Sequence, residues 1–70
     1  MGAEITFGQV VKTRRKELGL TQKELAHRVG CASVTLRKIE YNDLRPSVQI
    51  AEALATALNI LLESVLKMVG

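Results

Sequence analysis

The chain has little of several residue types on which other protein classes depend. It contains one cysteine, one proline, no tryptophan and only two aromatic residues, Phe7 and Tyr41. A single cysteine, Cys31, cannot form an internal disulfide, which excludes a disulfide-stapled scaffold. With so few aromatic residues, the core must be aliphatic and alanine-rich, as in small helical proteins rather than β-sandwiches. At 70 residues, we expect one domain spanning residues 1–70.

Long uninterrupted apolar runs are also lacking. No apolar segment follows Met1 in the pattern of a secretory signal. The apolar C-terminal stretch is interrupted by Glu52, Asn59, Glu63 and Lys67, so it cannot cross a bilayer. We therefore expect no membrane partner, and the single thiol fits a reducing, cytoplasmic location.

The positive charge is unevenly distributed along the chain. Residues 1–45 carry nine Lys and Arg against five Asp and Glu, a net charge of +4, whereas residues 46–70 carry −1. Two interpretations stand: a half that faces a polyanion, or a solvated surface of ordinary sign.

Two capping boxes mark the starts of helices. Thr6 is followed three residues later by Gln9, and Thr21 by Glu24. In this motif the hydroxyl accepts from the third helical N–H, and the third side chain reaches back to the cap N–H. The sequence therefore predicts a helix after Thr6 and a second helix over about 21–29.

Glycine and asparagine mark where helices end. Gly19 and Gly30 are placed to take a left-handed conformation, and Asn42 and Asn59 tolerate one better than most residues. These stops predict a third helix over about 33–41. A fourth runs from Val48 to about 58, and a fifth covers about 62–69. We expect an all-α fold, a compact five-helix bundle.

The second and third predicted helices are short and are joined by a tight turn containing Gly30, which is the arrangement of a helix-turn-helix. In such a motif the second helix enters a DNA major groove, so it needs one apolar and one polar face. Leu36 and Ile39 form the predicted apolar face. The outward face holds Ser33, Val34, Arg37 and Lys38.

The order of these residues resembles the Cro/phage-repressor type (XRE-like) of helix-turn-helix domain, also described as lambda-repressor-like. The matching residues are Leu18-Gly19-Leu20-Thr21-Gln22-Lys23-Glu24-Leu25-Ala26, Gly30, Ile39-Glu40 and Arg45-Pro46-Ser47. The resemblance covers residues 7–66. It implies a DNA-binding domain that usually acts as a dimer.

The resemblance also implies roles for individual residues. Gln22 would contact a backbone phosphate, although the same residue is also simply a good helix former. Ser33, Val34 and Lys38 would touch bases, and Arg37 a base or a phosphate. Asn42, Leu44 and Arg45 lie in the loop that approaches the phosphates.

Two further positions bear on the scaffold. The resemblance pairs Arg15 of the first helix with Glu40 at the end of the third, as a structural ion pair. Where family members often have Ser or Thr at the start of the third helix, this chain has Ala32. We expect that helix to start more weakly, because a Ser or Thr cap contributes about 1 kcal/mol.

The predicted fifth helix is apolar on most sides, and an exposed apolar surface of this size usually marks a partner. We expect a homodimer whose interface contains Leu61, Leu62, Val65, Leu66 and Val69. Two alternatives remain: these residues close a single core, or they pack on a further domain.

Catalytic and metal-binding motifs are lacking. His27 has no second His or Cys at metal-ligand spacing, and Cys31 has no catalytic partner nearby in the sequence. Lys12, Arg14 and Lys16 are equally well explained as phosphate contacts or as solvated charges. We predict no enzyme activity, no metal and no cofactor.

These observations predict sequence-specific binding of double-stranded DNA by a transcriptional regulator or repressor. The alternative is a protein-interaction or dimerisation module that keeps the helix-turn-helix fold without specific DNA binding. Ala32 and the apolar fifth helix favour that alternative.

Overall fold

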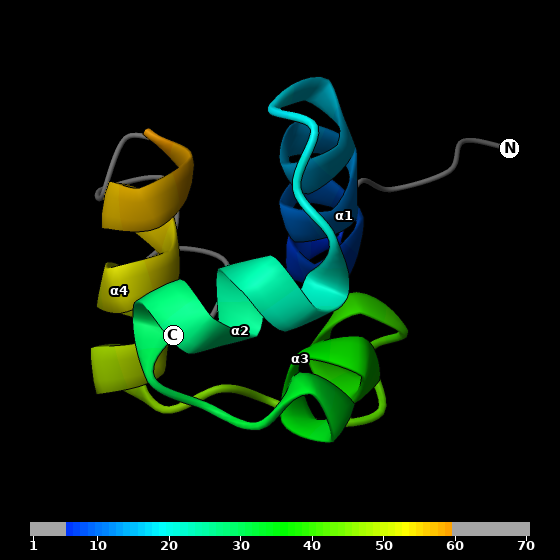
Figure 1. The fold of residues 1–70 in the computed structure, drawn as a ribbon. Helices are drawn as coiled ribbons and strands as arrows, with labels where there is room; N and C mark the ends of the chain where they lie inside the picture. The colour runs from blue at the N-terminus through cyan, green and yellow to red at the C-terminus, as the bar shows by residue number, and fades with distance from the viewer. Residues whose placement is uncertain (1–5, 60–70) are drawn as a thin grey trace, which may run out of the picture.

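A computed structural model describes residues 6–59, and these form four helices (Figure 1). The helices are α1 (Phe7–Glu17), α2 (Gln22–Val29), α3 (Ser33–Glu40) and α4 (Val48–Leu58). The described part of the chain is therefore all-helical, as predicted. The predicted fifth helix, over about 62–69, lies outside the described residues.

Both predicted capping boxes are confirmed. The Thr6 hydroxyl accepts from the Gln9 N–H at 3.2 Å, and the Thr6 N–H donates to Gln9 Oε1 at 3.1 Å. The corresponding distances between Thr21 and Glu24 are 3.0 and 2.8 Å. Each box satisfies N–H groups that a helix start otherwise leaves without acceptors, so α1 and α2 begin where the local sequence dictates.

Each helix is followed by a residue with a positive φ angle. The φ angles are 72° at Gly19, 78° at Gly30, 63° at Asn42 and 56° at Asn59. After α3, the Asp43 N–H donates to the Lys38 carbonyl at 2.8 Å, which closes the last turn. These left-handed residues turn the chain sharply, so short helices meet at steep angles.

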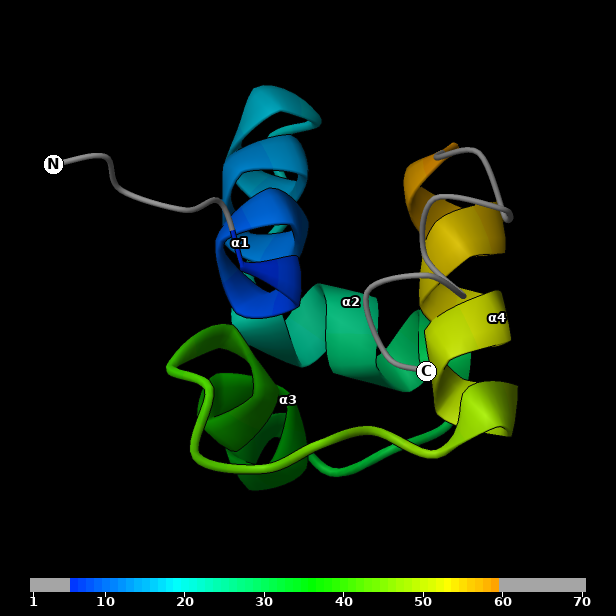
Figure 2. The ribbon, with the colours of Figure 1, turned by 180° about the vertical axis from the view of Figure 1, so that it is seen from behind.

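The helices surround one core, which is aliphatic apart from Phe7. Leu25, Leu36, Leu54 and Leu58 have no solvent exposure, and Ile39 has almost none. In Figure 1, α2 lies across between α1 and α4, and α3 lies at one end of the bundle beside α1 and α2. Figure 2 shows the same arrangement from behind. One face of α3 therefore packs on the core while the opposite face points away from the protein.

Arg14 joins α1 to the end of α4. Its Nε donates to the carbonyl oxygen of Leu58 at 2.9 Å, and its Nη1 pairs with Glu17 at 3.2 Å. The guanidinium thus satisfies a carbonyl that the end of α4 would leave unpaired. Arg14 is engaged within the fold, which neither interpretation of its charge from the sequence had included.

Candidate nucleic-acid interface

The third helix has one buried face and one exposed face. Leu36 and Ile39 are 0% and 1% exposed and pack into the core. Ser33, Arg37 and Lys38 are exposed on the other side, and Val34 is 48% exposed. The structure therefore brings the four residues of the predicted outward face onto one surface, which we call the α3 face.

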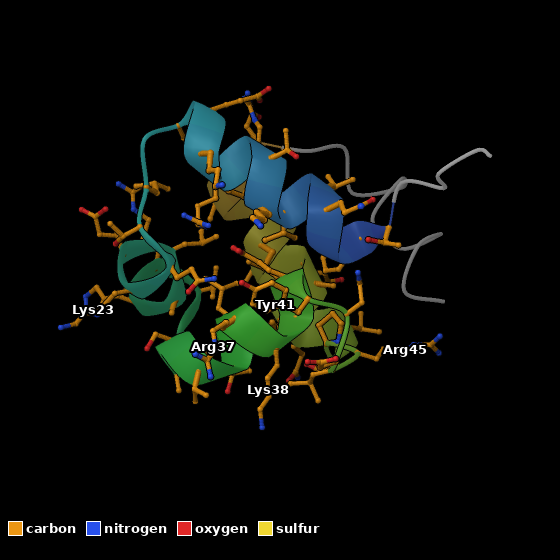
Figure 3. All side chains as sticks on the ribbon, turned by 90° about the vertical axis from the view of Figure 1, so that its right-hand side faces the viewer. Lys23, Arg37, Lys38, Tyr41 and Arg45 are labelled. Atoms are coloured by element: carbon orange, nitrogen blue, oxygen red, sulfur yellow. The ribbon has the colours of Figure 1, made fainter. Side chains whose placement is uncertain are left out.

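Basic side chains from other elements flank the α3 face. Figure 3 shows Arg37 and Lys38 extending from α3 away from the bundle, with Lys23 to one side and Arg45 to the other. Lys23 belongs to the first turn of α2, and Arg45 to the loop between α3 and α4. Such a row of cations offers an electrostatic footprint for a polyanion. Sequence reasoning did not single out Lys23, although it directly follows Gln22.

Tyr41 extends the α3 face at its C-terminal end. It follows Arg37 by four residues, which places both on the same side of the helix. The side chain is 61% exposed, and the Lys12 ammonium lies 5.5 Å from its ring centroid, within cation–π range. The sequence analysis missed this residue, and its four-residue spacing from Arg37 was the signal that would have found it.

A buried ion pair holds α1 against α3. Arg15 Nε donates to Glu40 Oε2 at 2.7 Å, and Arg15 Nη2 donates to Glu40 Oε1 at 3.1 Å. Arg15 is 8% exposed and Glu40 is 3% exposed. This two-bond geometry matches the planar guanidinium to the carboxylate and satisfies both charges inside the protein.

Gln22 contacts the same carboxylate from α2. Its Nε2 donates to Glu40 Oε1 at 3.0 Å, and the contact is partly buried. Arg15 also donates through Nη1 to the carbonyl of Leu20, at 2.8 Å, in the turn before α2. One carboxylate therefore joins side chains from α1, α2 and α3. The sequence analysis had given Gln22 a phosphate contact and had not predicted this bond.

Asn42 ties the loop after α3 to the start of α1. Its Oδ1 accepts from the Gly8 N–H at 3.3 Å, and its Nδ2 donates to the Thr6 hydroxyl at 3.0 Å. The predicted left-handed conformation of Asn42 is confirmed. The side chain thus has a structural role in addition to the phosphate approach that the resemblance implies.

The start of α3 has no side-chain cap. Ala32 occupies the N-cap position with an extended backbone, and no side-chain hydrogen bond is made there. The first N–H groups of α3 therefore gain no protein acceptor from a cap, and the weaker helix start stays a prediction.

The other reactive side chains do not assemble into a site within residues 6–59. His27 is exposed, and Cys31 is a free, partly buried thiol whose pKa is raised by that burial. Those residues contain no group of three or more His, Cys, Asp or Glu that could hold a metal ion. They also contain no helix long and apolar enough to span a membrane. The five predicted dimer-interface residues lie outside the described residues.

The fold agrees with comparisons to known proteins. A helix-turn-helix family model matches residues 11–65, most of the chain. A helix-turn-helix transcriptional regulator of Methanothermobacter thermautotrophicus is 45% identical over 49 residues, covering 70% of this chain and 71% of that protein. The chain belongs to the helix-turn-helix family of the Cro/phage-repressor type.

Two further similarities are to proteins of named function. The immunity repressor of Bacillus phage phi105 is 41% identical over 56 residues, covering 80% of this chain. This chain matches only 39% of that repressor's length. The solved structure of the biofilm regulator SinR of Bacillus subtilis in complex with DNA has a TM-score of 0.76 and 37% identity. That similarity covers 84% of this chain and 95% of the SinR chain.

Proposed function

We propose that this chain binds double-stranded DNA sequence-specifically as the DNA-binding domain of a transcriptional regulator or repressor. The observation that carries the proposal is the division of α3 into a core face and an exposed α3 face flanked by Lys23 and Arg45. Family membership and the similarity to a DNA-bound regulator support it.

In this mechanism α3 enters the major groove, which at about 12 Å accommodates one helix. The side chains that would meet base edges are Ser33, Val34, Arg37 and Lys38. Lys and Arg donate to guanine acceptors, Ser bonds to several bases, and Val packs on a thymine methyl group. No chemical step is involved, so function rests on differences in binding energy between sequences.

Contacts on either side of α3 would hold the phosphates. Gln22 lies in the first turn of α2, where the helix end favours an anion. Asn42 and Arg45 lie in the loop on the other side, and Lys23 adds charge next to Gln22. Phosphate contacts set the orientation of α3, and affinity should fall steeply with salt as counterions are released.

Selection from a random duplex pool at physiological salt tests specificity. A recurrent motif among the enriched duplexes is the expected result. Lack of enrichment by a folded protein would contradict sequence-specific binding and favour the protein-interaction alternative.

A matched pair of lysine variants tests whether α3 contacts the bases. Lys38 and Lys16 are both exposed and lie in the last turns of α3 and α1. The C-terminal end of α1 points away from α3 (Figure 1). Lys38→Ala should weaken binding about tenfold or more through a lost base contact, whereas Lys16→Ala should change it little. Equal losses would mean that only total charge matters.

We also propose that the chain acts as a homodimer through the predicted helix over about 62–69. A two-fold dimer would present two copies of α3 about 34 Å apart, one turn of DNA. Analytical ultracentrifugation should show dimers, and selected sites should be symmetric. A monomer at high micromolar concentration that selects asymmetric sites would contradict the dimer while leaving DNA binding intact.

A further inference from the structure

The carboxylate of Glu40 has more partners than a simple ion pair requires. Its Oε2 accepts from Arg15, and its Oε1 accepts from both Arg15 and Gln22. Glu40 itself is 3% exposed, whereas Gln22 is only half-buried and lies at the start of α2. The bond from Gln22 therefore connects a buried charge pair to the surface that would face a phosphate.

We propose that Glu40 is a positioning residue for DNA binding, holding the Gln22 amide in the orientation that contacts a phosphate. This inference rests on the proposed function. A glutamine amide nitrogen carries two hydrogens. One is directed to Glu40 at 3.0 Å, which fixes the amide plane and leaves the second hydrogen for an external acceptor. A glutamine without this anchor would lose rotamer freedom only when DNA binds.

Arg15 has a second part in this arrangement. A lone carboxylate beside Gln22 would repel a phosphate held by the same amide. The two bonds from Arg15, at 2.7 and 3.1 Å, balance that charge locally. The triad of Arg15, Gln22 and Glu40 therefore presents an oriented donor without a net negative charge. Arg15 also bonds to the Leu20 carbonyl at 2.8 Å, which positions the turn leading into α2.

A double-mutant cycle on the selected duplex tests the coupling. Gln22→Met removes the amide and Glu40→Gln removes the charge with little change in size. Each should weaken binding about three- to tenfold, the range for one hydrogen bond, when measured where circular dichroism shows the variant folded. The double variant should bind no more weakly than the single variant with the larger loss of affinity, because both substitutions remove the same coupled contact. Losses that multiply would overturn the positioning role.

A second experiment replaces single phosphates of the duplex, one at a time, with neutral methylphosphonates and measures the affinity for each duplex. A purely structural role of Glu40 would not change which phosphates matter. Wild-type protein should bind more weakly when the phosphate that Gln22 contacts is replaced. Gln22→Met and Glu40→Gln should each become insensitive to replacement of that phosphate and of no other. Both variants should stay sensitive to replacement of the phosphates that Arg45 contacts. Glu17→Gln, which removes an exposed carboxylate of α1, serves as the control and should leave the whole pattern unchanged. A uniform weakening at all phosphates in Glu40→Gln would contradict the inference.

A measurement on the unaltered chain covers the case in which Glu40→Gln does not fold. By NMR, one Gln22 amide proton should show a hydrogen bond in the free protein and keep it when duplex is added. The other should shift on binding. Loss of the first bond on binding would overturn the inference while DNA binding itself stands. If wild-type protein selects no duplex and the Gln22 amide does not respond to DNA, both the proposed function and this inference fail.

Discussion

The side-chain oxygen of Asn42 accepts a hydrogen bond from the backbone N–H of Gly8 at 3.3 Å, although the two residues are 34 positions apart in the sequence. The contact brings the first turn of α1 against the end of α3. A Cβ atom at Gly8 would lie 2.6 Å from the Glu40 carbonyl oxygen and 2.7 Å from Asn42 Oδ1, and closer still to the Ile39 carbonyl oxygen. Only glycine leaves room for this approach, and α3 takes its position on α1 from it.

Gly8→Ala should therefore destabilise the protein. Alanine in place of glycine within a helix ordinarily stabilises by about 1 kcal/mol, but here the methyl group meets backbone atoms that cannot move independently. We expect a net loss of about 2 kcal/mol, within the range for overpacking. Thr13→Ala, at an exposed position of the same helix, should be nearly neutral. Urea unfolding of both variants measures this, and a Gly8→Ala protein as stable as wild type would mean that the two helices separate readily.

Glu40→Ala should be far more damaging than the loss of an exposed carboxylate. It leaves the Arg15 charge buried without its partner, which typically costs about 3–5 kcal/mol. The matched control is Glu17→Ala, which breaks a pair between side chains that are 35% and 57% exposed. Exposed pairs contribute about 0–1 kcal/mol. Thermal melts should separate the two variants clearly, and equal melting temperatures would exclude a scaffold role for the buried pair.

The missing cap at Ala32 offers a stabilising substitution. Ala32→Ser places a hydroxyl at an N-cap whose φ and ψ of −73° and 149° already suit one. The expected gain is about 1 kcal/mol. Ser47→Ala is the converse, because the Ser47 hydroxyl accepts from the Ile50 N–H at 3.2 Å, and it should cost about the same amount. Chemical denaturation measures both, and a lack of any gain in stability for Ala32→Ser would contradict the predicted cap.

Acid should weaken the start of α2. Hydrogen bonds from the Thr21 backbone and side chain hold the pKa of Glu24 below its ordinary value near 4.5, and the nearby charge of Arg28 adds to this. A lowered folded-state pKa stabilises the protein above the unfolded-state pKa and ceases to do so as the pH falls through the lowered value.

The matched variants are Glu24→Gln and Glu52→Gln. Glu24→Gln should be less stable than wild type at pH 7, and the difference should shrink as the pH falls below 4.5. Glu52 is exposed on α4, and its side chain makes no hydrogen bond among the described residues, so the stability of Glu52→Gln should stay close to that of wild type at each pH. Urea unfolding midpoints, measured at pH 7 and again at a pH below 4.5, test this. A difference for Glu24→Gln that persists unchanged at low pH would contradict the assignment.

The helices and their ends were largely predictable, because their signals are local. A capping box acts over four residues, and a left-handed stop over the last turn. The α3 face followed from the same logic, since Leu36 and Ile39 had to point inward and Arg37 and Lys38 then pointed outward. Tyr41 was missed, although it lies four residues after Arg37 and therefore on the same side of the helix.

The sequence by itself determined where the chain is helical, where it turns and which side of α3 is polar. Only the tertiary structure decided that Gln22 bonds to Glu40, that Asn42 accepts from Gly8 and that Arg14 caps α4. These contacts join residues 18, 34 and 44 positions apart. They depend on the angles at which the helices cross, and those angles result from packing the whole core at once rather than from any local signal.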